Sequence, residues 1–206
     1  MSVIGAQEAL ERLREGNRRF ASDASGSEAA TSTSRRRELA AGQSPFAIIL
    51  GCSDSRVPAE IIFDQGLGEL FVIRVAGNIV APSQIGSVEF AAERYGTRLV
   101  VVLGHSNCGA ILTTIEELGR APDHRHRNLG SIVNRIKPSV QSLLDTGLIE
   151  DHDALVRHSV RTNIRMSVGH LRTGSAVLEH LIADEGLMVV GAEYSLETGL
   201  VEFFDT

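Results

Sequence analysis

Four short, continuous apolar segments constrain the fold of this chain more than any other feature of its sequence. They are FAIILG, LFVIRV, LVVVLG and LMVVGA, which begin at residues 46, 70, 99 and 187. Uninterrupted apolar runs of this length are typical of parallel strands that are covered on both faces. Segments with helical periodicity lie between them. The sequence therefore predicts an α/β fold with a mostly parallel central sheet of four strands, flanked by helices.

Apolar residues that recur every three or four positions predict the helices that connect these strands. One such helix spans residues 84–95, and a second begins directly after Cys108 in the segment GAILTTIEELG. Residues 128–185 contain two or three more, with Pro138 as a kink or boundary and Gly174 between two of them. Helices of this kind are the usual crossover connections between parallel strands.

The two ends of the chain extend this core. Residues 6–20 have the pattern of an amphipathic helix, and the Ser-, Ala- and Thr-rich stretch after it indicates a linker before a short helix at residues 35–41. We expect residues 1–34 to form an N-terminal helical arm and linker, of a kind that often packs on a second subunit. The final segment, YSLETGLVEFFD, predicts a strand, a turn near residue 198 and an antiparallel edge strand.

Composition indicates the size and the environment of the protein. With 206 residues, of which 43% are hydrophobic, we expect residues 1–206 to form a single domain around one core. The net charge is −6 and no long block of Lys and Arg occurs, which gives no support for nucleic-acid or anionic-membrane binding. No apolar stretch approaches the roughly 20 residues that span a bilayer, and the N-terminus lacks the apolar core of a signal peptide, so we expect a cytoplasmic protein.

Reactive side chains follow two of the predicted strands. CSDSRVP, residues 52–58, follows the first apolar run, and HSNC, residues 105–108, follows the third. Ligands of open α/β sheets bind beyond the carboxyl ends of the strands, so we expect Cys52, His105 and Cys108 to meet there as a donor set suited to zinc. Each half alone is a weak signal, since a buried Cys is usually a small apolar residue. Together the two halves use both cysteines of the chain, which favours a metal site.

CSDSRVP followed about fifty residues later by GHSNCGA resembles the β-class carbonic anhydrases. The resemblance covers about residues 43–110 and extends more loosely to both ends. It implies one Zn²⁺ per chain, held by Cys52, His105 and Cys108, and a catalytic pair formed by Asp54 and Arg56. It also implies an obligate homodimer or a tetramer of dimers.

The resemblance further implies zinc-dependent, reversible hydration of carbon dioxide to bicarbonate and a proton. Three protein ligands leave the fourth zinc position open for a water, whose hydroxide form attacks carbon dioxide. In this interpretation Asp54 accepts a hydrogen bond from the hydroxide and orients it, while Arg56 keeps Asp54 ionised. The family offers a second arrangement, in which Asp54 itself binds the zinc at low pH, and the sequence does not decide between the two.

Four further positions match residues that line the family's substrate pocket: Gln43, Phe71, Phe90 and Gly109. Gln43 offers a side-chain donor to a bicarbonate oxygen, and the backbone N–H of Gly109 at a helix start suits an anion. Phe71 and Phe90 are equally consistent with an ordinary core, and many members carry Tyr in place of Phe90. The substrate pocket is therefore an expectation that rests on the resemblance.

One departure from the family concerns regulation. Members that bicarbonate inhibits cooperatively carry a Trp three residues before the first zinc cysteine and an Arg at the position of Arg74. This chain has Ile49 in place of that Trp and contains no Trp at all. The resemblance therefore implies an incomplete regulatory pocket, with Arg74 as a structural partner near the dimer surface.

Two other functions are compatible with these residues. Hydrolases of carbon disulfide or carbonyl sulfide use the same fold and donor set, because a zinc hydroxide can attack any linear cumulated carbon, and they differ in access to the pocket. A non-catalytic zinc or thiol-sensing protein belongs to a different class. Against it, a closed structural site usually needs four Cys or His ligands, and Asp54 and Arg56 would have no task.

Overall fold

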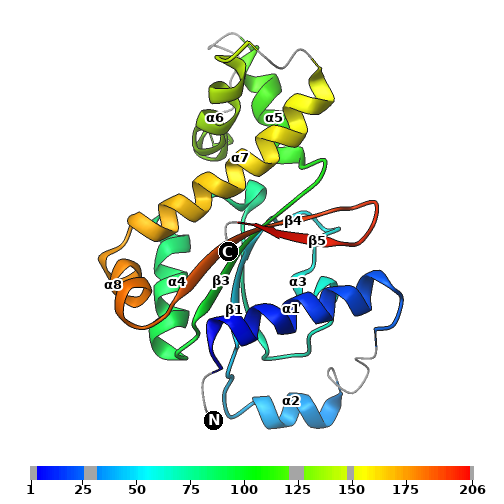
Figure 1. Cartoon of the computed structure of the whole chain (residues 1–206), viewed down its shortest axis with the longest axis vertical. Helices are drawn as coiled ribbons and strands as arrows, with labels where there is room; N and C mark the ends of the chain where they lie inside the picture. Colours follow the sequence, from blue (N-terminus) through cyan, green and yellow to red (C-terminus); the bar gives the residue numbers. More distant parts are fainter. Residues whose placement is uncertain (1–3, 26–31, 121–127, 148–150, 205–206) are drawn as a thin grey trace.

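A five-stranded mixed sheet forms the centre of the computed structural model, which describes residues 4–25, 32–120, 128–147 and 151–204 (Figure 1). The strand order is β2-β1-β3-β4-β5, in which the first four strands are parallel and β5 is antiparallel to β4. The strands are β1 (Ala47–Gly51), β2 (Leu70–Arg74), β3 (Leu99–His105), β4 (Met188–Tyr194) and β5 (Val201–Phe204). This confirms the fold class predicted from the sequence.

Helices cover both faces of the sheet, which explains why β1 and β3 are continuously apolar. Every residue of these two strands is buried. Side chains alternate along a strand, so Ile48 and Leu50 contribute to the core on one face, and Ile49 contributes to the core on the other. The first face is covered by α4 (Pro82–Arg94), α7 (His152–Thr173) and α8 (Ala176–Asp184), and the second by α1 (Ala6–Ala21) and α3 (Ala59–Ile62) (Figure 1).

The N-terminal helix α1 packs on the sheet of its own chain. Leu10 and Leu13 on its apolar face are fully buried in the core. The buried Asn17 side chain donates to the carbonyl of Gly199 at 2.9 Å and accepts from the N–H of Val201 at 2.8 Å, which ties α1 to the β4–β5 hairpin. The chain's own sheet thus offers the apolar surface that an amphipathic helix needs, and contact of the arm with a second subunit stays a prediction.

The region between residues 128 and 185 contains three helices in its described parts: α6 (Gly130–Leu144), α7 and α8. Gly174 separates α7 from α8, as predicted, whereas Pro138 lies inside α6 rather than at a boundary. Proline has no N–H, so the carbonyl of Asn134, four residues earlier, lacks its usual helical donor. Both residues are exposed, so water can donate to this carbonyl instead. Together with α5 (Gly109–Leu118), α6 packs against α7 near the carboxyl end of the sheet (Figure 1).

Short elements were harder to anticipate. α2 (Thr33–Leu39) begins and ends two residues before the predicted helix at residues 35–41. α3, with four residues, and the 3₁₀ turn η2 (Ala76–Asn78) had no prediction at all. Elements of one turn are too short to show a hydrophobic period, so the sequence carries little signal for them.

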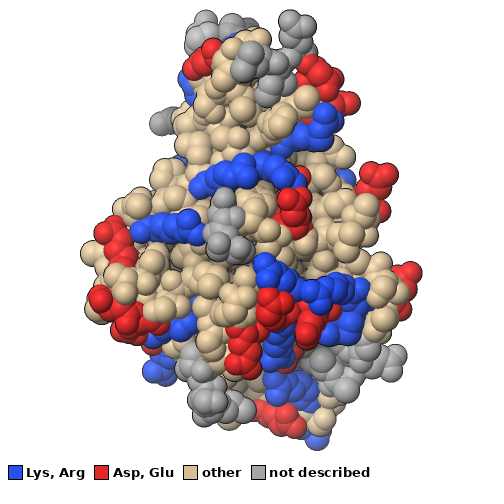
Figure 2. Space-filling model, viewed as in Figure 1, with Lys and Arg blue, Asp and Glu red and all other residues tan. Residues whose placement is uncertain are grey.

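Charged side chains of both signs are interspersed over the surface. On the face shown in Figure 2, basic and acidic side chains alternate over α1. One exposed arginine of this helix, Arg19, pairs with Asp64 at 2.6 Å. Among the described residues, no helix combines the length and the apolar character that crossing a membrane requires.

Candidate active site

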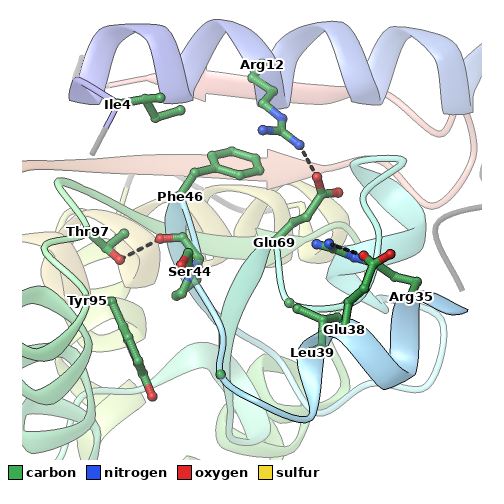
Figure 3. Close-up of a pocket in the computed structure, with 13 residues that line it drawn as sticks. Ile4, Arg12, Arg35, Glu38, Leu39, Ser44, Phe46, Glu69, Tyr95 and Thr97 are labelled. Atoms are coloured by element: carbon green, nitrogen blue, oxygen red, sulfur yellow. Dashed lines mark hydrogen bonds and ion pairs between the residues drawn. The ribbon is translucent and has the colours of Figure 1, made fainter. Parts of the chain in front are cut away.

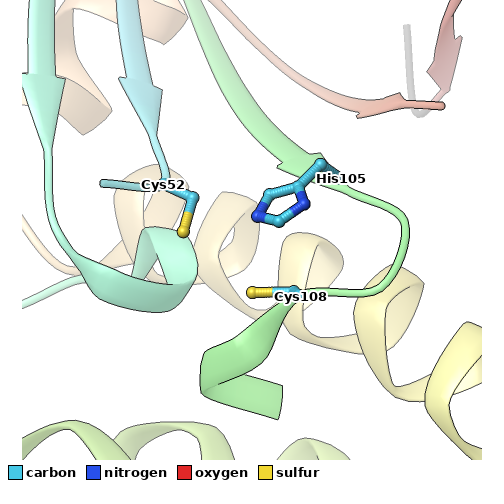
Figure 4. Close-up of side chains that lie close together, drawn as sticks. All are labelled: Cys52, His105 and Cys108. Atoms are coloured by element: carbon cyan, nitrogen blue, oxygen red, sulfur yellow. The ribbon is translucent and has the colours of Figure 1, made fainter. Parts of the chain in front are cut away.

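Cys52, His105 and Cys108 lie together at the carboxyl edge of the sheet (Figure 4). Their ligand atoms, two Sγ and one imidazole nitrogen, all lie within 4.8 Å of one another. The three residues are 4%, 0% and 2% exposed, and both cysteines are free thiols. The structure thus brings together the three residues that the sequence predicts as one donor set.

The strand register explains why Cys52 and His105 meet. β1 and β3 are parallel neighbours in which Gly51 pairs with Leu103. The residues that follow the two strands therefore lie side by side at the carboxyl edge of the sheet. Cys108 joins them through a tight turn, in which Asn107 has a φ of 53°, a left-handed conformation that Asn adopts more readily than most residues. This turn places Cys108 at the N-cap position of α5, beside the two strand ends.

The His105 ring presents one nitrogen to the donor set. Its Nδ1 lies 2.9 Å from the carbonyl oxygen of Ser106, and because a carbonyl only accepts, Nδ1 carries the proton. Nε2 therefore has a free lone pair, and this buried atom has no hydrogen-bond partner among the described residues. A buried polar atom without a partner is costly, and ligation of a metal would satisfy it.

The two sulfur atoms carry one negative charge between them in the metal-free protein. A hydrogen bond with Cys108 lowers the pKa of Cys52 to about 4 against the effect of burial, with smaller contributions from His105 and the N–H of Gly77. The same hydrogen bond, together with burial, raises the pKa of Cys108. Burial lowers the pKa of His105, but Cys52, the Ser106 carbonyl and Asp54 together outweigh burial, so the net shift is upward. A thiolate is therefore already present where a cation would bind.

A tetrahedral metal ion fits this arrangement. Zinc bonds to Cys and His of about 2.0–2.3 Å place the ligand atoms roughly 3.5–4 Å apart, which small side-chain rotations reach from the observed separations. Asp54 is not part of the donor set, so three protein ligands would leave a fourth coordination position open. An open position is typical of catalytic rather than structural zinc sites.

Asp54 and Arg56 form an ion pair at the rim of the donor set. The Arg56 side chain donates to both carboxylate oxygens of Asp54, at 2.9 Å and 2.8 Å, and its backbone N–H donates to Oδ1 at 3.0 Å. Oδ2 also lies 3.8 Å from Nε2 of His105. The hydrogen bonds from Arg56 hold the pKa of Asp54 well below its usual range. An ionised acceptor therefore faces the donor set.

Two further groups support this site, and the sequence analysis missed the second. Arg74, for which a structural role was expected, donates to the carbonyl groups of Cys52, at 3.0 Å, and of Asp54, at 2.6 Å, and so holds the loop that carries both residues. The N–H of Gly77 donates to Sγ of Cys52 at 3.3 Å. The Gly-Asn pair after β2 predicts a turn there, but no sequence signal indicates its contact with sulfur.

Three of the four predicted substrate residues lie away from the donor set within one chain. Phe71 pairs with β1 four residues before Cys52, which is roughly 13 Å along the sheet. Phe71 and Phe90 pack against each other and against Tyr95, with ring centroids 5.7–6.1 Å apart, and Gln43 donates to the Tyr95 hydroxyl at 2.9 Å. We call Phe71, Phe90 and Tyr95 the aromatic cluster. Phe90 is 51% exposed, so this cluster reaches the surface.

Two cavities lie at opposite ends of the sheet. One, of about 580 Å³, is lined by Arg56 and by Ser106 and Asn107, the two residues between His105 and Cys108. The other, of about 550 Å³, lies between α1, α2 and the start of β1 (Figure 3). In this second cavity Arg12 is paired with Glu69, so its charge is already neutralised. Of these two, the cavity at the carboxyl end is the one that Arg56 of the ion pair lines.

Comparison with known proteins gives a consistent assignment. A family model described as carbonic anhydrase matches residues 47–201. Carbonic anhydrase 2 of Mycobacterium tuberculosis is 38% identical over 193 residues, which are 93% of this chain and 89% of that protein. The carbonic anhydrase of Mycolicibacterium smegmatis is 35% identical over 196 residues, 94% of this chain and 91% of that protein.

Solved structures agree with this result. A tetrameric β-carbonic anhydrase from Sordaria macrospora has the same fold, with a TM-score of 0.75, 22% identity, and coverage of 97% of this chain and 98% of that one. The β-carbonic anhydrase CcaA has a TM-score of 0.75 at 26% identity, over 96% of this chain and 88% of that one. The chain therefore belongs to the β-class carbonic anhydrases.

Proposed function

We propose that this chain is a zinc enzyme that catalyses the reversible hydration of carbon dioxide to bicarbonate and a proton. One observation carries the proposal. Cys52, His105 and Cys108 form a buried donor set with an unpartnered Nε2, and the ionised Asp54 lies 3.8 Å from that nitrogen. A purely structural metal site would have no use for such a carboxylate. Membership of the carbonic anhydrase family supports the same reaction.

Each group at the site has a separate role in this reaction. Zinc, when bound, supplies a Lewis acid that makes water acidic enough to act as a nucleophile near neutral pH. Asp54 accepts a hydrogen bond from the nucleophilic oxygen and so directs a lone pair towards carbon dioxide. Arg56 holds the carboxylate by two parallel hydrogen bonds and keeps it ionised, and Arg74 holds the loop on which Asp54 lies.

Gly109 is the predicted substrate residue that lies beside the donor set in the same chain. It is exposed, follows Cys108 directly and is the first residue of α5. The N–H groups in the first turn of a helix have no partner within the helix, and the helix dipole favours a negative charge there. We therefore assign to the Gly109 N–H the binding of a bicarbonate oxygen.

The aromatic cluster enters the site only when a second copy of the chain supplies it. The resemblance assigns Gln43, Phe71 and Phe90 to the substrate pocket, whereas in one chain they lie at the other end of β1 and β2. We therefore propose a homodimer in which the cluster of one chain covers the site of its partner. The tetrameric relative from Sordaria macrospora supports assembly beyond a single chain, and a tetramer built from such dimers is the larger alternative.

Stopped-flow hydration of carbon dioxide by protein with a quantified zinc content tests the proposal. We expect turnover that increases in proportion to zinc, up to one ion per chain, and no turnover in the zinc-free variant Cys108→Ser. Hydrolysis of carbon disulfide or carbonyl sulfide without hydration of carbon dioxide would assign the chain to the sulfur-substrate hydrolases. Full zinc occupancy without turnover on any of these substrates would indicate a non-catalytic protein.

A further inference from the structure

A short turn behind the donor set connects Cys52 to α7. This turn is η2, which follows β2 and whose central residue, Gly77, donates its N–H to Sγ of Cys52. The ribbon of the turn lies beside the Cys52 side chain in Figure 4. Two of its carbonyl groups accept from side chains of α7: Asn163 Nδ2 donates to Gly77 at 2.8 Å, and Ser167 Oγ donates to Asn78 at 3.1 Å.

We propose that Asn163 is a positioning residue of the metal centre. By holding the carbonyl group of Gly77, Asn163 fixes the orientation of that residue, so that its N–H stays directed at the sulfur of Cys52. The inference rests on the proposed function, since Cys52 acts as a metal ligand only there. It assigns a role to a residue 86 positions away in the sequence from the turn that it holds.

The turn needs external contacts to keep its shape. Gly77 has a φ of 71°, and a Cβ at this position would lie 2.7 Å from Cδ1 of Ile136, so only glycine fits. Asn78 has a φ of 43°, also in the left-handed region, which few residues other than Gly and Asn adopt readily. Asn163 and Ser167 are four residues apart on α7 and 3% and 4% exposed, so they present two buried donors to the turn from one helix face.

The position of α7 relative to the donor set is fixed by a close contact with β3. Gly104 of β3 immediately precedes His105, and a Cβ on Gly104 would lie 2.5 Å from Cδ1 of Ile164. The Ile164 side chain therefore packs directly on the backbone of the strand at Gly104. Because Ile164 follows Asn163, this contact also fixes the position from which Asn163 reaches Gly77.

A hydrogen bond to a metal-bound thiolate changes the metal. The N–H withdraws electron density from sulfur, so the sulfur donates less charge and the metal remains a stronger Lewis acid. Partners of this kind, which touch a ligand rather than the metal, typically contribute about 10–100-fold to metal affinity or activity. Asn163 does not touch the ligand but acts on it through Gly77. We therefore expect the most sensitive sign of its loss to be a change in the electron donation from the Cys52 sulfur to the metal.

Replacement of Asn163 by alanine in the full chain, loaded with cobalt(II), tests this inference. Cobalt(II) accepts the same ligands as zinc, and its thiolate-to-metal absorption band reports how readily sulfur gives up charge. In Asn163→Ala we expect this band to move to lower energy, because the thiolate loses its hydrogen bond. We also expect zinc affinity, measured by competition with a chelator, to fall by up to about tenfold, because Cys52 is held less firmly in the position that binds the metal.

Ser159→Ala is the matched control. Ser159 lies on the same helix, is fully buried, and its hydroxyl has no hydrogen-bond partner in the part of the chain that the structure describes. We expect its band and its zinc affinity to match the unsubstituted protein. Ser167→Ala should shift the band in the same direction as Asn163→Ala but less, because Ser167 holds the next carbonyl along the turn. Asn163→Asp, which keeps the shape but loses the donor, replaces Asn163→Ala if that variant does not fold.

The outcomes separate this inference from the proposed function. A shifted band in Asn163→Ala with an unchanged band in Ser159→Ala supports it. An unchanged band and zinc affinity in a folded but less stable Asn163→Ala protein would show a merely structural role and overturn it, as would equal shifts in both variants. An unsubstituted protein without any thiolate-to-cobalt band would overturn the metal centre itself, and the inference with it.

Discussion

The Asp54 carboxylate is bound by Arg56 on one side and lies 3.8 Å from the unpartnered Nε2 of His105 on the other. The two hydrogen bonds from Arg56 reach both carboxylate oxygens, including Oδ2, the oxygen that faces His105. The carboxylate is therefore ionised and fixed, with one oxygen directed towards the place where a metal would bind. Because Asp54 and Arg56 are not metal ligands, substitutions at these two residues can change the reaction rate without changing the zinc content.

We expect Asp54→Asn to lower carbon dioxide hydration by about 10²-fold or more, which is the usual scale for the loss of a group that handles a proton in the transition state. The amide keeps the shape of the carboxylate but loses its charge and its second acceptor oxygen. Zinc content should be unchanged, because Asp54 is not in the donor set. Stopped-flow rates and metal analysis on the same sample check both parts, and activity close to that of the unsubstituted protein would rule out the proposed role.

Arg56→Lys should lower the rate less than Asp54→Asn but more than a surface substitution does. Lysine keeps the positive charge, yet it cannot form the two parallel hydrogen bonds that arginine forms with Asp54. Arg35→Lys, on α2 away from the donor set, is the matched control. Equal rates for Arg56→Lys and its control would show that charge alone, without the fixed geometry, is sufficient.

Zinc affinity should rise with pH, by about tenfold per pH unit for each proton that binding releases. The pKa of Cys108 is raised, so its thiol is protonated across the neutral range and loses a proton when a metal binds. Cys52, with a pKa of about 4, is already a thiolate there and releases none. His105, whose pKa is also raised, adds a second proton towards acidic pH and steepens the dependence. Chelator competition at a series of pH values measures this slope, and a pH-independent affinity would contradict it.

Phe90→Arg should weaken association and lower activity without changing zinc content. Phe90 is 51% exposed in the single chain, and in the proposed dimer it lies against the site of the partner. An arginine there would lose its hydration on association, and this desolvation disfavours the interface. Leu144→Arg is the control, since Leu144 is also an exposed apolar residue, at 43%, but lies at the end of α6. Sedimentation velocity distinguishes the two variants, and an unchanged assembly in Phe90→Arg would exclude the aromatic cluster from the interface.

Leu13→Ala should lower the free energy of unfolding by about 2–5 kcal/mol, the range for leucine removed from a packed core. Leu13 is fully buried between α1 and the sheet. Leu200→Ala, at a position that is 51% exposed, should change stability little. Denaturant unfolding of both variants measures the difference. A small effect at Leu13 would show that α1 does not pack on this sheet in solution.

The central sheet and the donor set were predictable because both follow from local sequence. Continuous apolar runs indicate strands that are covered on both faces, and the carboxyl ends of parallel strands meet at one edge. Cys52 and His105 come at two such ends, so their proximity needs no knowledge of side-chain packing. The same reasoning located α4 and α5 to within a few residues.

The remaining features depend on contacts between distant segments. The distance of Phe71 from Cys52 is set by the register of β2 against β1, which the apolar runs leave open. The contact of Asn163 with Gly77 joins residues 86 positions apart, and a single buried Asn on a helix carries no signal of its partner. The surface chosen by α1 was not predictable either, because an amphipathic stripe shows that a partner surface exists but not which one.

The three ligands are anchored by different parts of the fold. Cys52 and His105 follow neighbouring central strands, so they cannot move apart without opening the sheet. Cys108 is the N-cap of α5, and its carbonyl accepts from the N–H groups of Ile111 and Leu112 at 3.0 Å and 3.1 Å. A bound metal would therefore join α5 to the central sheet as a cross-link between segments that are more than fifty residues apart in the chain.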